Sequence, residues 1–111
     1  MASDEVLAQR LREALRSESD VTEKSMFGGV AFLVHGNMSV SASGQGGMLV
    51  RVDPALTEEL TSDPNVHIAV MRGREMRGWL RVDDAGLESA AQLRAWVKRG
   101  VAFARSLPAK R

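Results

Sequence analysis

The sequence predicts an α+β domain that folds as a two-layer sandwich, with three helices packed on a five-stranded antiparallel sheet. Apolar residues recur at helical spacing near both ends of the chain, whereas in the middle they alternate or form short blocks. Tight turns separate these blocks, and short connections favour antiparallel pairing. The expected order is helix, three strands, helix, two strands, helix, in one domain over residues 1–111.

Three amphipathic helices account for both ends of the chain and one internal segment. The first is expected over residues 4–17, where leucines are spaced among charged residues. The second follows Asp53, a preferred N-cap, and Pro54, which suits the first helical position. The third covers 93–104 and stops before Pro108. The buried positions expected on these helices are Leu7, Leu11, Ala14, Leu15, Leu56, Leu60, Leu93, Trp96, Val97, Gly100, Val101 and Ala104.

The strands are predicted from apolar blocks and from alternation. In the second strand Ser39, Ser41 and Ser43 alternate with apolar residues, which predicts that the serine side faces water. The expected strands cover 27–34, 38–43, 48–52, 66–71 and 76–82. The side chains expected beneath the helices are Val30, Phe32, Met38, Val40, Val50, Val52, Ile68, Val70, Leu80 and Val82, with Met48 and Met76 on the same side of their strands.

Two glycine-rich segments have structural interpretations. Gly28 and Gly29 lie within the first predicted strand, where they indicate a bulge or a close backbone approach such as tight helix packing, rather than a ligand site. The segment 44–47 joins two predicted strands and is followed by neither the helix nor the lysine that a phosphate-binding loop requires. It is therefore expected to be a hairpin loop.

Composition excludes several classes of function. Fifteen Lys and Arg against fourteen Asp and Glu give a net charge of +1, without the basic excess of a dedicated nucleic-acid binder. The chain has no cysteine, which excludes disulfides, thiolate metal sites and a cysteine nucleophile. No apolar run approaches the roughly 18 residues of a membrane span, and the first residues do not resemble a signal peptide. We expect a cytoplasmic protein that does not associate with membranes.

No catalytic constellation is recognisable. His35 and His67 are the only histidines, and neither lies in a pattern of metal ligands. The serines have no accompanying nucleophile motif, and Asp53, Asp83 and Asp84 stand where helix starts are stabilised by negative charge. We therefore expect a protein that is not an enzyme and that uses no metal or cofactor.

One group of residues is not explained by folding needs. Arg77, Trp79 and Arg81 are expected on one face of a strand, with Arg72 and Arg74 at the adjoining turn. Such a group can be an ordinary solvated surface, can bind nucleic acid through phosphates and base stacking, or can form a protein interface, where Trp and Arg are enriched. The near-neutral charge favours protein contact over nucleic acid, while a plain surface stays an equal alternative.

Several short segments are distinctive in combination: MFGG at 26–29, GNM at 36–38, LVRVDP at 49–54, MRGREMRGW at 71–79, WV at 96–97 and AFA at 102–104. Together they resemble one bacterial family, the N-terminal domain of the TfoX/Sxy competence regulators. The resemblance spans nearly the whole chain and implies a two-layer sandwich with a five-stranded antiparallel sheet. Members that regulate DNA uptake are thought to act with the cyclic-AMP receptor protein at promoters, and no catalytic residues carry over.

The resemblance and the residues together lead to a functional expectation. We expect a non-enzymatic regulatory or protein-interaction domain, linked to transcription, that binds a protein partner or a second copy of itself. A nucleic-acid or small-ligand binding module that uses the Arg and Trp residues is the alternative.

Overall fold

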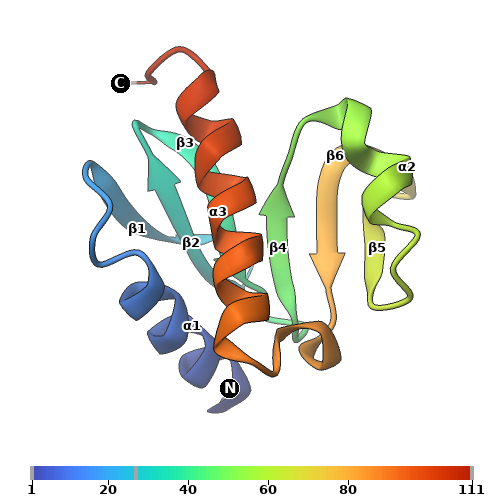
Figure 1. Ribbon diagram of the computed structural model, residues 1–111, viewed down its shortest axis with the longest axis horizontal. Coiled ribbons are helices and arrows are strands. Elements are labelled where there is room, and N and C mark those ends of the chain that lie inside the picture. The colour runs from blue at the N-terminus through green and yellow to red at the C-terminus, as the bar shows by residue number, and fades with distance from the viewer. Residues whose placement is uncertain (1, 27, 111) are drawn as a thin grey trace.

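The fold is an antiparallel sheet with helices on one of its faces (Figure 1). A computed structural model describes residues 2–26 and 28–110. The strands are ordered β1-β2-β3-β4-β6-β5 and each pairs antiparallel with its neighbours. The elements are α1 (Ala2–Ala14), β1 (Val21–Met26), β2 (Gly29–Val34), β3 (Asn37–Ala42), β4 (Met48–Arg51), α2 (Thr57–Leu60), β5 (Val66–Met71), β6 (Arg74–Val82) and α3 (Ala90–Ser106), with short 3₁₀ turns at Pro54–Leu56 and Asp84–Leu87. The predicted α+β class and its three helices are confirmed.

The sheet has six strands, so the prediction of five is wrong. The strand that was not predicted is β1, which lies at the edge of the sheet and pairs with β2 alone. Residues 22–25 are exposed on both sides of the strand, so β1 shows no apolar alternation in the sequence. Charged and polar side chains are typical of edge strands, because they discourage pairing with other chains.

The first predicted strand begins later than expected, at Gly29. Phe27 lies outside the described residues, and Gly28 is in the turn between β1 and β2 with a φ of 77°. A Cβ atom on Gly29 would lie 2.0 Å from the carbonyl oxygen of Ala42. The expected close backbone approach is therefore present, but it is made by the neighbouring strand β3 rather than by a helix.

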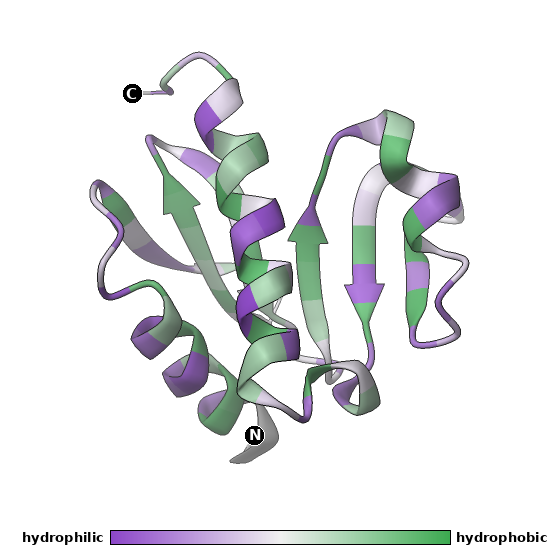
Figure 2. Ribbon diagram, in the orientation of Figure 1, coloured by the Kyte–Doolittle hydropathy of each residue, from purple (hydrophilic) through white to green (hydrophobic). Residues whose placement is uncertain are grey.

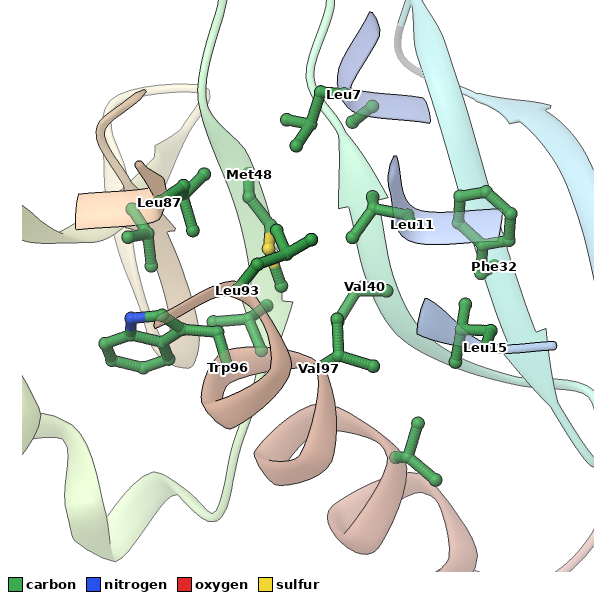
Figure 3. Packing of buried hydrophobic residues seen from close by; sticks show 14 of the residues in the cluster. Leu7, Leu11, Leu15, Phe32, Val40, Met48, Leu87, Leu93, Trp96 and Val97 are labelled. Atoms are coloured by element: carbon green, nitrogen blue, oxygen red, sulfur yellow. The ribbon is translucent and has the colours of Figure 1, made fainter. Parts of the chain in front are cut away.

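The main core lies between the sheet and the helices α1 and α3 (Figure 3). Both helices carry hydrophobic and hydrophilic residues on different sides (Figure 2), and Leu11, Phe32 and Met48 are fully buried between the layers. Trp96 is 8% exposed and belongs to this core, as predicted. In the short second helix the prediction for Leu56 is wrong, because this side chain is 38% exposed and Thr57 is buried instead.

A bulge between β2 and β3 changes the faces predicted for β3. Phe32 pairs with Val40 but Leu33 pairs with Met38, so Ser39 is the extra residue. Met38 therefore lies on the face without helices, contrary to the prediction. The expected wet serine side is also wrong, since Ser39 and Ser41 are 0% and 3% exposed. The buried Ser39 hydroxyl donates a hydrogen bond to the Phe32 carbonyl at 2.8 Å.

A second bulge, in β6, separates residues that the alternation had grouped. Ile68 pairs with Leu80, but the next residue of β5 pairs with Met76, so 77–79 are extra on β6. Gly78 lies within this bulge with a φ of 86°, in the left-handed region that favours glycine. As a result Met76 faces away from the helices. The prediction for Val70, near the end of the edge strand β5, is also wrong, because this side chain is 58% exposed.

Candidate functional site

The face of the sheet opposite the helices carries its own apolar cluster. Ala31, Met38, Leu49 and Ala69 are buried there, and Met26 and Trp79 pack against them. We call this side the helix-free face, because none of the described helices covers it. The partly exposed side chains of Met26 and Trp79 bring this cluster to the surface, and exposed apolar surface marks contact sites.

A groove of about 320 Å³ crosses this face between β1 and β6. We call it the methionine groove, because Met26, Met38, Met71, Met76 and Trp79 line it. Four of the six methionines in the chain are thus gathered in one place. Methionine side chains are flexible and polarisable, and they are frequent at surfaces that adapt to a binding partner.

The C-terminal end of the described chain borders the groove. Lys110 lines it, and the backbone N–H of Lys110 donates to the His35 carbonyl at 2.7 Å. The side chain of Asn37 donates to the Pro108 carbonyl at 3.0 Å. These bonds hold residues 108–110 beside the turn between β2 and β3.

Trp79 is half-buried at one side of the groove and is stacked on an arginine. The guanidinium carbon of Arg51 lies 4.9 Å from the centre of the Trp79 ring. The same atom lies 5.5 Å from the ring of Phe103, which belongs to α3. Arg51 therefore stacks with both rings, and it covers one face of the indole.

Arg77 does not lie beside Trp79, although the sequence grouped them. The bulge at Gly78 turns Arg77 towards α2, where its guanidinium donates to both carboxylate oxygens of Glu58, one of them at 2.8 Å. The hydrogen bond from Arg77 lowers the pKa of Glu58 to about 2, and the pair raises the pKa of Arg77. Arg77 is thus part of an ion pair on the helix side of the molecule.

Arg81 lies on the helix-free face but is engaged with the loop between β3 and β4. Its Nη1 donates to the Ser43 hydroxyl at 3.0 Å and to the Gly46 carbonyl at 3.3 Å. The loop is a hairpin connection, as predicted for 44–47. A second hollow of about 190 Å³ lies here, with Leu49 and Met71 in its walls.

Arg72 lies in the exposed turn between β5 and β6, and Arg74 is the first residue of β6. Arg72 has a φ of 52° and precedes Gly73 in the turn. Arg74 pairs with Met71, a residue of the groove, and residues paired directly across strands share a face. Of the five predicted residues, the structure therefore places Arg74, Trp79 and Arg81 on the helix-free face, leaves Arg72 at the tip of the turn, and separates Arg77.

The sequence did not indicate the methionine groove or Arg51. The position of Arg51 could have been predicted, because alternation with the buried Val50 places it on the opposite side of β4. The positions of Met38 and Met76 could not, since both reach the groove only through bulges. Met26 lies on the strand that was not predicted.

In the described residues, no three His, Cys, Asp or Glu side chains come together in an arrangement that would hold a metal ion. His67 hydrogen-bonds to Asp83, with 2.8 Å between Nε2 and Oδ2, at the end of β5 and β6 away from the groove. No helix within 2–26 and 28–110 is long and apolar enough to cross a membrane.

Comparison with known protein families identifies the family of this chain. No curated protein matches the sequence. The model of the TfoX N-terminal domain matches residues 13–104, from the last turn of α1 through all six strands and most of α3. The chain therefore belongs to the TfoX N-terminal domain family.

Proposed function

We propose that the domain is a non-enzymatic protein-binding module that acts in regulation, with a link to transcription, and that its partner binds the helix-free face. One observation carries the proposal: an uncovered sheet face has four methionines and a tryptophan around a single groove. Membership of the TfoX N-terminal domain family supports the regulatory role. A cytoplasmic location, expected from the sequence, is part of the same proposal.

The arrangement of the arginines favours protein over nucleic acid as the partner. Base stacking needs an accessible aromatic face, and Arg51 already covers one face of Trp79. Arg77 is paired with Glu58, and Arg81 is bound to the loop at 43–47. The groove instead presents apolar, deformable side chains, which suit the apolar anchor residues of a protein partner.

The test is site-specific photo-crosslinking in native lysate. A photoreactive amino acid at position 76, in the groove, should capture a partner that the same group at position 95 does not capture. Ala95 is exposed on α3 and serves as the matched control. Identification of the captured protein by mass spectrometry then tests the regulatory part, which predicts a protein of the transcription machinery.

A substitution tests the same surface independently. Trp79→Ala should weaken capture from position 76, with truncation costing about 2 kcal/mol or more of binding energy if Trp79 is a hot spot. Thermal melting of the variant is the fold control, because Trp79 also packs against the buried cluster of the helix-free face. Identical capture from positions 76 and 95, or unchanged capture by a folded Trp79→Ala protein, would contradict the proposal.

A further inference from the structure

The charges of the sheet are divided between its two faces. Lys24 pairs with Ala31, Arg81 with Leu49 and Arg51 with Trp79, and each of these partners belongs to the apolar cluster of the helix-free face. Arg74 joins them through its pairing with Met71. Residues paired across strands share a face, so four cations lie on the helix-free face in a chain whose net charge is only +1.

The carboxylates of the strands lie on the other side. In the described strands these are Glu23 and Glu75. Glu23 pairs with Phe32, a residue of the main core, and accepts hydrogen bonds from Arg12 of α1. Glu75 alternates with Met76 and so points to the helix side. Outside the strands, Asp83 is bound to His67 just beyond β6, and Asp20 lies 3.4 Å from His35 in the turn between β2 and β3.

Two exposed cations lie on the two strands that contribute Met26 and Met76 to the groove. Lys24 is on β1, two residues from Met26, and Arg74 is on β6, two residues from Met76. Both side chains are exposed, whereas the two methionines are half-buried. The surface thus combines an apolar centre with a cationic rim, and complementary potentials favour an acidic partner on such a rim.

This charge pattern decides between the possible occupants. A second copy that bound through the same face would bring cations against cations, which costs binding energy. Nucleic acid would meet the cationic rim, but the centre offers thioethers and one arginine-covered indole in place of hydrogen-bond donors. A protein segment that carries both carboxylates and bulky apolar side chains fits the rim and the centre together.

We propose that the methionine groove binds an acidic segment of another protein, which inserts a bulky apolar side chain between Met26 and Met76 and places its carboxylates against Lys24 and Arg74. This inference rests on the proposed function and specifies the chemistry of the partner. Because rim charges act mainly through long-range attraction, the affinity falls as salt rises from about 0.05 M to about 0.5 M.

The experiment selects peptides from a random display library on the full chain. Binders that fail to bind a Met26→Gln/Met76→Gln variant are classed as groove-dependent, since glutamine keeps the size of methionine while adding a polar amide. Thermal melting of this double variant and of each single variant verifies that the proteins are folded. We expect groove-dependent peptides to be net acidic and to share a bulky apolar residue.

Charge reversal then tests the rim with a selected peptide. Lys24→Glu/Arg74→Glu should lower its affinity by about tenfold or more and reduce its salt dependence. Lys98→Glu, an exposed change on α3, is the matched control and should leave the affinity unchanged. Groove-dependent peptides that are neutral or basic, or an affinity unaffected by the reversal, would overturn the acidic partner while leaving the proposed function intact.

The remaining outcomes identify the other occupants. Failure to recover any groove-dependent peptide would contradict the proposed function together with this inference. A short single-stranded DNA whose binding depends on Lys24 and Arg74 but not on the methionines would assign the face to nucleic acid. A dimer in sedimentation that the methionine variant dissociates would assign it to a second copy.

Discussion

Arg51 stacks on Trp79, with 4.9 Å from its guanidinium carbon to the ring centre, and the contact lies beside the proposed binding groove. Arg51→Ala removes the cation, so it should lower the free energy of unfolding by about 0.5–2 kcal/mol. It should also expose more of the indole to water. In a Trp96→Phe background, where Trp79 is the one tryptophan left, its fluorescence emission should shift to longer wavelength.

The second tryptophan supplies the control for this measurement. The guanidinium carbon of Arg99 lies 4.7 Å from the ring centre of Trp96, on α3 and away from the groove. Arg99→Ala should leave the Trp79 emission unchanged. The same emission in the Arg51→Ala protein as in its parent would show that the stacking does not persist in solution.

The pairing of Arg77 with Glu58 predicts a pH dependence of stability. Hydrogen bonding from Arg77 lowers the pKa of Glu58 to about 2, from 4.5. The folded state thus holds the proton less tightly than the unfolded state, so the stabilisation is complete above about pH 4.5 and is lost as pH falls towards 2. The effect should be small, because the two side chains are 54% and 70% exposed.

Chemical denaturation between pH 2 and pH 6 measures this effect. Glu58→Gln should flatten the dependence of the unfolding free energy on pH over the acidic part of this range. Glu59→Gln, one residue further along α2, is the matched control. Equal slopes for wild type and Glu58→Gln would contradict the ion pair.

Gly78 sets the positions of Arg77 and Trp79, so its substitution should disturb both. A Cβ at this position would lie 2.9 Å from the Val52 carbonyl oxygen, and the φ of 86° is strained for any other residue. Gly78→Ala should cost about 1–3 kcal/mol of unfolding free energy. Gly73→Ala separates backbone strain from crowding. Gly73 has a φ of 76°, but no atom lies near its Cβ position, so only the strain applies there. Urea denaturation that gives equal losses for both variants would exclude crowding at Gly78.

Gly100 allows α3 to lie close against the sheet. A Cβ there would lie 2.6 Å from the Ser39 carbonyl oxygen and 2.8 Å from Val40 Cγ1. Helix propensity alone predicts that Gly100→Ala stabilises the protein by about 1 kcal/mol, whereas crowding predicts a loss of about 1–3 kcal/mol. We expect a lower melting temperature. Ala102→Gly, on the exposed side of α3, measures the propensity contribution alone. A higher melting temperature for Gly100→Ala would show that the helix can move away from β3.

The predictable part of the fold is the part governed by periodicity. Leu7, Leu11 and Trp96 are buried as their helical spacing indicates, and Val50 and Leu80 lie beneath the helices as alternation indicates. The predictions fail where the chain departs from a regular period. One extra residue at Ser39 and three at 77–79 reverse the faces of Met38 and Met76, and neither bulge follows from local sequence alone.

The candidate site was therefore predicted only in part. Trp79 and Arg81 lie on the expected face, because they pair with β4 on the same regular stretch of β6 as Leu80. Arg77 lies within the bulge, on the other side of Gly78, and is turned towards Glu58 of α2. The groove itself brings together residues from β1, β3, β5 and β6, and this combination depends on a strand order that a single sequence does not specify.

The attachment of residues 108–110 beside the turn between β2 and β3 affects how the domain is handled in the laboratory. Because Lys110 lines the methionine groove, an affinity tag or fluorescent protein fused after this tail would emerge at the rim and crowd an incoming partner. The first helix, α1, lies on the opposite face of the sheet, where it packs against β2 and β3. Reporter and purification fusions should therefore be attached ahead of α1, which leaves the groove accessible in every assay that depends on it.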